Sequence, residues 1–139
     1  MKTDEKIGGE VMLHVAAAII RRNGKILICR RGAGGNCAYL WEFPGGKVDS
    51  GETPEECVTR ECREELDIEI RLKEIYEETT FSYPDKDIAF SFYNAELLKG
   101  QPVKKVHTDI VWALPEELLN YEFCPADVDI VKKLAVCNV

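Results

Sequence analysis

Two apolar segments, which a short polar turn separates, follow the first ten residues of the chain. Residues 11–20 (VMLHVAAAII) and residues 25–30 (KILICR) read as strands. Asn23-Gly24 between them is a strong signal for a tight two-residue hairpin turn. The sequence therefore predicts a β-hairpin, which a glycine-rich loop, GAGGNCAY, follows.

The second half of the chain reads as further strands and a closing helix. A β-like stretch covers residues 69–83, and a turn at 84–86 leads into a segment around residues 88–93 that alternates with the period of a strand. Residues 106–114 read as another strand, and residues 115–119 as a short helical turn. A final helix over about residues 127–136 has an apolar face made of Val128, Val131, Leu134 and Ala135.

A helix near the middle of the chain has a clear start and a clear buried side. Thr53 can cap it, Pro54 suits its first turn, and Glu56 completes a capping box with Thr53. The apolar stripe that would anchor this helix on a core consists of Val58, Cys62 and Leu66. Strands around this helix, with a second helix at the end, predict an α+β fold in which a sheet carries one helix on each face.

Three acids gather beside that apolar stripe. Glu61, Glu64 and Glu65 fall within about one third of the helix circumference. Their mutual repulsion, roughly a few tenths of a kcal/mol per pair, does not help the helix to form. A solvated acidic face is the simpler interpretation, but a glycine turn precedes the acids at a fixed offset. This combination favours a hard cation such as Mg²⁺, which prefers carboxylate oxygens.

Length and composition are those of one globular domain. The 139 residues, 45% hydrophobic and 31% charged, contain no repeat or low-complexity linker, so we expect a single domain over residues 1–139. The apolar run 11–20 is too short to span a bilayer. The leading segment MKTDEKIGGE mixes acids with lysines, which argues against a secretory signal and for a cytoplasmic location.

Cysteine spacing and net charge exclude two further classes. The six cysteines form no CxxC pair, which disfavours a zinc site, and they are expected to be reduced and mostly buried. The formal charge of −7 argues against a polymeric nucleic acid as partner. A small phosphorylated substrate remains compatible with it, because bound metal ions would supply positive charge locally.

Residues 46–68 read G-x5-E-x7-R-E-C-x-E-E-x2-I, which resembles the signature box of the Nudix hydrolases, G-x5-E-x7-R-E-U-x-E-E-x-G-U, with U a bulky aliphatic residue. The matching residues are Gly46, Glu52, Arg60, Glu61, Glu64, Glu65 and Ile68. Cys62 at a U position is a mild change, whereas Asp67 replaces the last glycine. The resemblance implies the Nudix fold, a mixed β-sheet in an α/β/α sandwich, and hydrolysis of a nucleoside diphosphate linked to another group.

The resemblance also implies roles for the residues of the box. The metal ligands would be Glu61, Glu64, Glu65 and the backbone carbonyl of Gly45, holding Mg²⁺ with Mn²⁺ as a substitute. Arg60 would pair with a box glutamate, and Glu52 would brace the loop against the helix. The glutamate that accepts the proton of the attacking water is left open, because assignments vary across the family.

Residues outside the box resemble one branch of the family, the MutT-type nucleoside triphosphate pyrophosphohydrolases. The branch resemblance rests on WEFPGGK, on Arg30-Arg31 upstream and on Tyr83-Pro84-Asp85 downstream. These enzymes release a nucleoside monophosphate and pyrophosphate, and some remove oxidised nucleotides such as 8-oxo-dGTP. Arg31 would then contact phosphates, unless it is only an exposed strand end. Phe43 and Tyr83 could flank the base, although core aromatics at strand ends are as common.

Asp127 falls where this branch places a base-reading residue, just before the last helix. Bacterial enzymes for oxidised guanine carry asparagine there, whereas some cytidine triphosphate pyrophosphohydrolases carry PAD, as this chain does. A carboxylate accepts a hydrogen bond from an exocyclic amine such as cytosine N4. Asp127 could equally cap the helix, and both roles are compatible.

One acid of the branch is absent. MutT-like chains often carry a glutamate before a histidine that lies five residues ahead of a tryptophan, and this chain has Val106-His107 and Trp112. Asp109 could replace the acid if the strand turns it toward the box. His107 is expected at the surface of the strand.

Three functions are compatible with these residues. The first is a pyrophosphohydrolase of (deoxy)nucleoside triphosphates, including oxidised ones, with a CTP- or dCTP-preferring enzyme as a variant. The second is hydrolysis of ADP-ribose or nucleotide sugars, which usually needs insertions that this chain lacks. The third is a non-hydrolytic nucleotide sensor, which typically loses box glutamates that are all present here. The expected partner is a small nucleotide, and the chain could be a monomer or a homodimer.

Overall fold

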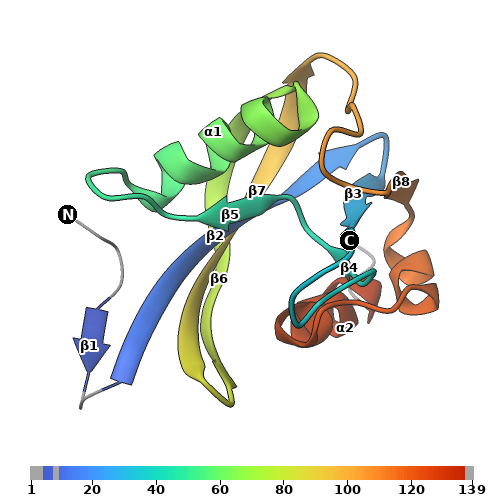
Figure 1. Ribbon diagram of the computed structural model, residues 1–139. Helices are drawn as coiled ribbons and strands as arrows, with labels where there is room; N and C mark the ends of the chain where they lie inside the picture. The colour runs from blue at the N-terminus through green and yellow to red at the C-terminus, as the bar shows by residue number, and fades with distance from the viewer. Residues whose placement is uncertain (1–4, 8–9, 137–139) are drawn as a thin grey trace.

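The computed structural model describes residues 5–7 and 10–136, with side chains from residue 12 onward. The strands within these ranges are β1 (Glu5–Ile7), β2 (Glu10–Arg22), β3 (Lys25–Arg30), β4 (Trp41–Glu42), β5 (Gly45–Lys47), β6 (Glu69–Tyr83), β7 (Lys86–Lys99) and β8 (Asp109–Ala113) (Figure 1). The helices are α1 (Pro54–Leu66) and α2 (Val128–Val136), with short 3-10 helices η1 (Pro115–Asn120) and η2 (Pro125–Asp127).

The strands form one mixed sheet with the central order β4-β3-β2-β7-β6. β2 and β7 pair in parallel, and the other pairs are antiparallel. β2 changes partner along its length: Arg21 and Arg22 pair with β3, whereas Val15–Ala17 pair with β5. This change brings the Gly45-Gly46 pair to the middle of β2.

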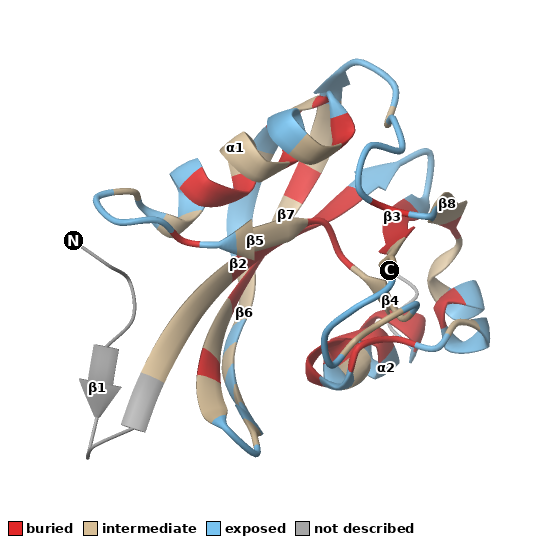
Figure 2. Cartoon of the chain, viewed as in Figure 1, coloured by how far each residue is buried: buried red, intermediate tan, exposed pale blue. Residues whose placement is uncertain are grey.

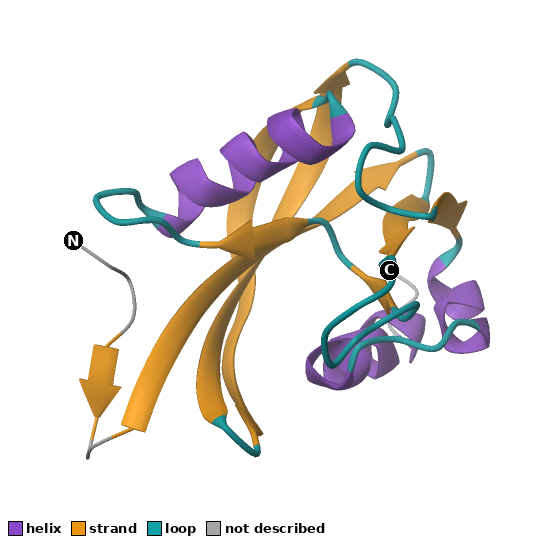
Figure 3. Ribbon diagram, in the orientation of Figure 1, coloured by secondary structure: helices purple, strands orange, loops and turns teal. Residues whose placement is uncertain are grey.

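The sheet lies between two helical layers, so the predicted α/β/α sandwich is confirmed (Figures 1 and 3). Side chains of β2 alternate between the two faces, with Ala16 and Ala18 in the core under α1, and Ala17 and Ile19 in the core under α2. Figure 2 shows the buried residues concentrated where α1 and α2 meet the sheet. The small alanine side chains let the helical layers and β5 approach β2 closely.

Both ends of α1 follow the sequence signals. The Thr53 hydroxyl accepts the Glu56 N–H at 3.1 Å, and the Glu56 carboxylate accepts the Thr53 N–H at 2.9 Å, which is the expected capping box. Pro54 occupies the first turn. Asp67 ends the helix in the left-handed conformation, with φ 62° and ψ 37°, where the family pattern has glycine.

The sequence-based elements differ from the structure at several places. β4 and β5 were not predicted, and β2 and β7 are longer than expected. The last strand begins at Asp109, because the chain at Val106 is an exposed bend and His107 turns inward. The cysteines at positions 29, 37, 57, 62 and 124 are free, and all but Cys37 are buried. Cys137 and much of the leading segment lie outside the described residues.

No helix among the described residues is long and apolar enough to cross a membrane.

Candidate active site

One cavity of about 520 Å³ gathers most of the predicted site residues. The four residues predicted to bind substrate all line it: Arg31, Phe43, Tyr83 and Asp127. Three of the predicted metal ligands line it as well: Gly45, Glu61 and Glu65. The other predicted residues, Glu52, Arg60 and Glu64, lie on α1 or the loop before it and do not line this cavity.

Because Gly45 and Gly46 have no side chains, β5 can lie in direct contact with the backbone of β2 and with the Glu61 carboxylate. A Cβ on Gly45 would lie 2.1 Å from the carbonyl oxygen of Ala16, so β5 could not pair with β2 at this distance. A Cβ on Gly46 would lie 2.4 Å from Oε2 of Glu61. The Glu61 carboxylate therefore lies directly against the backbone of β5, in space that any other residue at position 46 would fill.

Glu61 and Glu65 form a close acidic pair at the cavity wall. Their carboxyl groups are hydrogen-bonded to each other. Burial raises the pKa of Glu61, and burial together with the charge of Glu61 raises the pKa of Glu65 to about 7. Two half-buried carboxylates in this arrangement repel unless a proton or a cation lies between them, and hard oxygen donors suit Mg²⁺.

Arg60 holds the box glutamates in place, as the resemblance implied. Its Nε and Nη2 donate to the two oxygens of Glu52 at 2.9 and 2.8 Å, a bidentate pair. Its Nη1 donates to Glu61 at 3.3 Å and to Glu64 at 3.0 Å. Glu52 also accepts the Asp49 N–H at 2.8 Å, so it ties the loop to the helix, and the Arg60 hydrogen bonds lower its pKa to about 2.

Glu64 differs from its predicted position. Its side chain is 59% exposed and pairs with Arg60, so it does not point into the cavity beside Glu61 and Glu65. Within residues 12–136, no three acidic, histidine or cysteine side chains form a ready-made metal cluster. The donor set nevertheless fits a hard cation, because Glu61, Glu65 and the Gly45 carbonyl share one cavity. Glu64 would have to leave Arg60 to join them.

Glu42 is a residue of the cavity that the sequence reasoning missed. Its Oε1 accepts Nη1 of Arg31 at 3.1 Å, and its Oε2 lies 3.0 Å from Nε2 of His107. The expectation that His107 is a surface residue is wrong, because its side chain is only 2% exposed. The sole sequence signal for Glu42 was its position next to Phe43 in WEFPGG.

Asp109 does not take the place of the missing acid. Its carboxylate accepts the N–H of the following residue, Ile110, at 2.9 Å, and it does not line the cavity. Val106 is 58% exposed. The described acids of the cavity wall are Glu42, Glu61, Glu65 and Asp127.

Asp127, which the sequence suggested as a base-reading residue or a helix cap, is buried in the structure. The residue is only 6% exposed, and its carboxyl accepts the backbone N–H of Phe43. This bond joins η2 to the segment between β4 and β5, which differs from simple capping of α2. Burial raises the pKa of Asp127 well above its usual range.

The two predicted aromatic residues have different environments. Phe43 is 3% exposed and packs on Phe123, with ring centroids 5.4 Å apart, so it belongs to the core under α2 as well as to the cavity floor. Tyr83 is half-buried at the tip of the β6–β7 hairpin, where its hydroxyl lies 3.9 Å from Sγ of Cys37. Of the two, Tyr83 has the more exposed side chain, whereas Phe43 is buried.

Comparison with known proteins agrees with this geometry. The sequence matches the NUDIX domain family over residues 12–134, and the chain belongs to the Nudix hydrolase family. It is 39% identical over 124 residues to an 8-oxo-dGTP diphosphatase of Haemophilus influenzae, covering 88% of this chain and 91% of that protein. It is 37% identical over 121 residues to the CTP pyrophosphohydrolase of Escherichia coli, covering 87% and 90%.

Solved structures show the same fold. The solution structure of the E. coli ORF135 protein superposes with a TM-score of 0.78 at 35% identity, covering 92% of this chain and 91% of that one. MutT from Aliivibrio salmonicida and Vibrio cholerae, described together, gives a TM-score of 0.74 at 30% identity, covering 88% and 95%. The predicted family and its MutT-like branch are thus confirmed.

Proposed function

We propose that the protein hydrolyses nucleoside triphosphates, including oxidised ones such as 8-oxo-dGTP, to the monophosphate and pyrophosphate. The observation that supports this most is one cavity that holds the Glu61–Glu65 pair together with Arg31 and Asp127. Acids for a cation, a guanidinium for phosphate and a buried polar group for a base are the three parts that such a reaction needs. With a net charge of −7, free nucleotides are the proposed substrates, not nucleic-acid polymers.

The proposed cofactor is Mg²⁺, with Mn²⁺ as a substitute. Glu61, Glu65 and the Gly45 carbonyl would hold it, joined by Glu64 after that side chain leaves Arg60. When bound, the cation neutralises phosphate charge and polarises the attacking water. The raised pKa of Glu65 supports this assignment, because burial and the neighbouring Glu61 charge both disfavour the ionised carboxylate, and a bound cation would offset both effects.

Arg31 is proposed to bind the phosphate groups. One Nη contacts Glu42, while Nε is buried and has no partner among the described residues. Glu42 is itself held by His107 on its other oxygen. The chain His107–Glu42–Arg31 therefore orients the guanidinium fork, which suits phosphate oxygens.

Asp127 is the proposed base-reading residue, and it supports a second candidate substrate. Its raised pKa favours a neutral carboxyl, which offers one donor and one acceptor much as an asparagine amide does. This fits an 8-oxoguanine or a guanine edge. The ionised form would accept from cytosine N4, and the relative that hydrolyses CTP makes CTP or dCTP the second candidate.

Glu64→Gln and Glu65→Gln test the proposed metal site. Each should lower pyrophosphate release from the best triphosphate by about 100-fold or more, because a carboxylate that binds the cation or moves a proton is lost. Glu116→Gln, an exposed acid on η1, is the matched control and should behave as wild type. Near-normal turnover in both box variants would refute the site. Hydrolysis of ADP-ribose alone, or nucleotide binding without hydrolysis, would favour the other two functions.

A further inference from the structure

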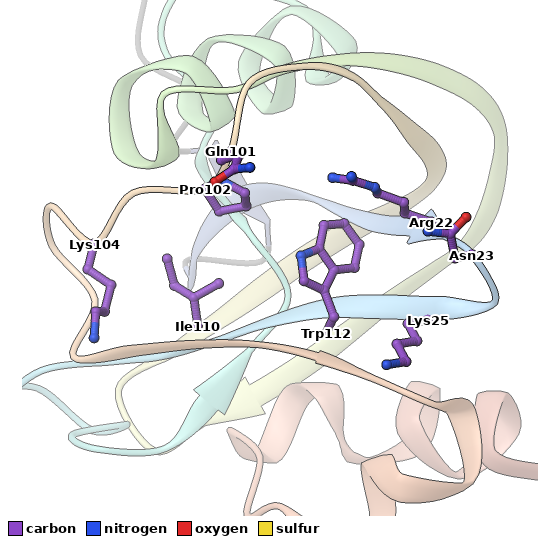
Figure 4. Close-up of a pocket in the computed structure, with 8 residues that line it drawn as sticks. All are labelled: Arg22, Asn23, Lys25, Gln101, Pro102, Lys104, Ile110 and Trp112. Atoms are coloured by element: carbon purple, nitrogen blue, oxygen red, sulfur yellow. The ribbon is translucent and has the colours of Figure 1, made fainter.

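A second cavity, of about 570 Å³, shares no lining residue with the catalytic one. We call it the Trp112 groove. Its residues come from the end of the β2–β3 hairpin, from the segment that joins β7 to β8, and from β8 itself (Figure 4): Arg22, Asn23, Lys25, Gln101, Pro102, Lys104, Ile110 and Trp112. In Figure 4 Ile110 and Trp112 stand side by side on β8, with Lys104 toward one end and Arg22 and Lys25 toward the other.

The groove exists because α1 does not cover the whole face of the sheet. Ile110 and Trp112 pack at the edge of the core under α1 and stay partly exposed. Residues 100–108 pass over this part of the sheet instead (Figure 1). Two backbone hydrogen bonds fix that segment: Val103 N–H donates to the carbonyl of Leu66 at 2.9 Å, and Thr108 N–H donates to the carbonyl of Arg30 at 2.9 Å. The wall of the groove is therefore defined by backbone hydrogen bonds.

Positive charge collects in this groove although the chain as a whole carries −7. Arg22, Lys25 and Lys104 line it, and no described acidic residue does. Arg22 and Lys25 are direct partners across the β2–β3 pair, an arrangement of like charges that destabilises a sheet. None of the three cations has an ion pair among the described residues. Folding alone does not account for this placement, whereas a bound anion would relieve the repulsion.

The groove also offers an aromatic surface. The guanidinium of Arg22 lies over the Trp112 ring, 6.0 Å from its centroid, so charge and ring face the same space. Asn23 and Gln101 add amide groups that can pair with polar ring edges. The volume lies in the range of small-molecule sites, about 300–1,000 Å³.

We propose that the Trp112 groove is a second binding site, for a phosphorylated aromatic molecule of the nucleoside monophosphate class. Arg22 and Lys25 at one end of the groove would contact the phosphate, and the indole of Trp112 would contact the ring. Lys104 at the other end would donate to the polar edge of that ring. The site is independent of the proposed reaction, because it uses none of the residues of the catalytic cavity and requires no metal ion.

Titration with AMP, followed by NMR of the tryptophan indole N–H groups in the presence of chelator, tests this site. Trp112 should shift in a saturable manner, whereas Trp41, which packs on Tyr121 elsewhere, should serve as the unshifted reference. Adenosine and inorganic phosphate should each bind at least about tenfold more weakly than AMP, because each offers only half of the contacts. Triphosphate hydrolysis is measured in a separate assay. Failure of the proposed reaction and failure of the proposed binding site can therefore be told apart.

Two charge variants and one control complete the test. Arg22→Ala and Lys104→Ala should each weaken AMP binding about tenfold at the Trp112 signal, while Lys132→Ala, an exposed lysine on α2, should not. The absence of a saturable Trp112 shift, or binding that both variants leave unchanged, would overturn the site. Phosphate binding as tightly as AMP would overturn the nucleotide assignment, because the ring would then contribute nothing.

Discussion

Substitutions at Asp127 distinguish two roles of this residue: stabilising the fold and recognising the base of the substrate. The Asp127 carboxyl is buried and accepts the Phe43 N–H. Asp127→Asn keeps an acceptor oxygen, whereas Asp127→Ala leaves a buried donor unsatisfied, which costs about 1–3 kcal/mol. At roughly 4 °C per kcal/mol for a domain of this size, Asp127→Ala should melt about 4–12 °C below wild type. At acidic pH, the Tm of Asp127→Asn should be close to that of wild type.

The pH dependence of stability gives an independent check. Burial raises the pKa of Asp127 in the folded state above the unfolded value of about 3.9. Such a group contributes its stability below the unfolded pKa and loses it as pH rises through the folded-state pKa. Urea unfolding from about pH 4 upward should therefore show wild type losing stability relative to Asp127→Asn. A constant difference across this range would mean that the carboxyl is ionised in the folded protein.

Kinetics then test the recognition role. Asp127→Ala should reduce discrimination between 8-oxo-dGTP, dGTP and CTP by about tenfold to about 150-fold, which corresponds to about 1.5–3 kcal/mol, and should affect the best turnover less. Asp127→Asn should retain most of the preference, because an amide resembles a neutral carboxyl. The assay is kcat/KM for each nucleotide. If Asp127→Ala lowers kcat/KM equally for all three substrates and also lowers the Tm, Asp127 only stabilises the fold.

Three shorter predictions follow from the box. Millimolar Mg²⁺ should raise the Tm of wild type but not of Glu65→Gln, measured by thermal unfolding, and an equal rise in both would remove Glu65 from the metal site. Gly46→Ala should abolish most turnover because its Cβ would displace the Glu61 carboxylate, whereas Gly32→Ala, with 3.8 Å of clearance, should remain active in the same pyrophosphate assay. Asp67→Gly should raise the unfolding free energy by up to about 1 kcal/mol and leave turnover intact, since it relieves a left-handed aspartate; a large activity loss would assign Asp67 a catalytic role.

Elements with local signals could be predicted from the sequence. The Asn23-Gly24 turn has both residues at positive φ, and the Thr53–Glu56 capping box needs only contacts within one helical turn. The left-handed conformation of Asp67 is also a local feature, because it lies at a helix end where the family pattern has glycine. These features depend on contacts between residues that are close in the sequence, so the local sequence is enough to predict them.

Features that depend on distant contacts could not be predicted. β5 is Gly-Gly-Lys, with little intrinsic preference for a strand, and it pairs only because the small side chains of β2 admit it. His107 turns inward to reach Glu42, 65 positions away in the chain. The burial of Asp127 likewise depends on the Phe43 N–H, and the pairing of Glu64 with Arg60 depends on which of several carboxylates the guanidinium binds.

Product analysis by ³¹P NMR decides whether the protein is a pyrophosphohydrolase of nucleoside triphosphates. Purified protein is incubated with 8-oxo-dGTP, dGTP, CTP or ADP-ribose, with Mg²⁺ or with excess chelator. We expect pyrophosphate and the monophosphate from at least one triphosphate, only with the cation, and loss of this activity in Glu65→Gln. Release of orthophosphate in place of pyrophosphate, turnover in excess chelator, or cleavage of ADP-ribose alone would contradict this expectation.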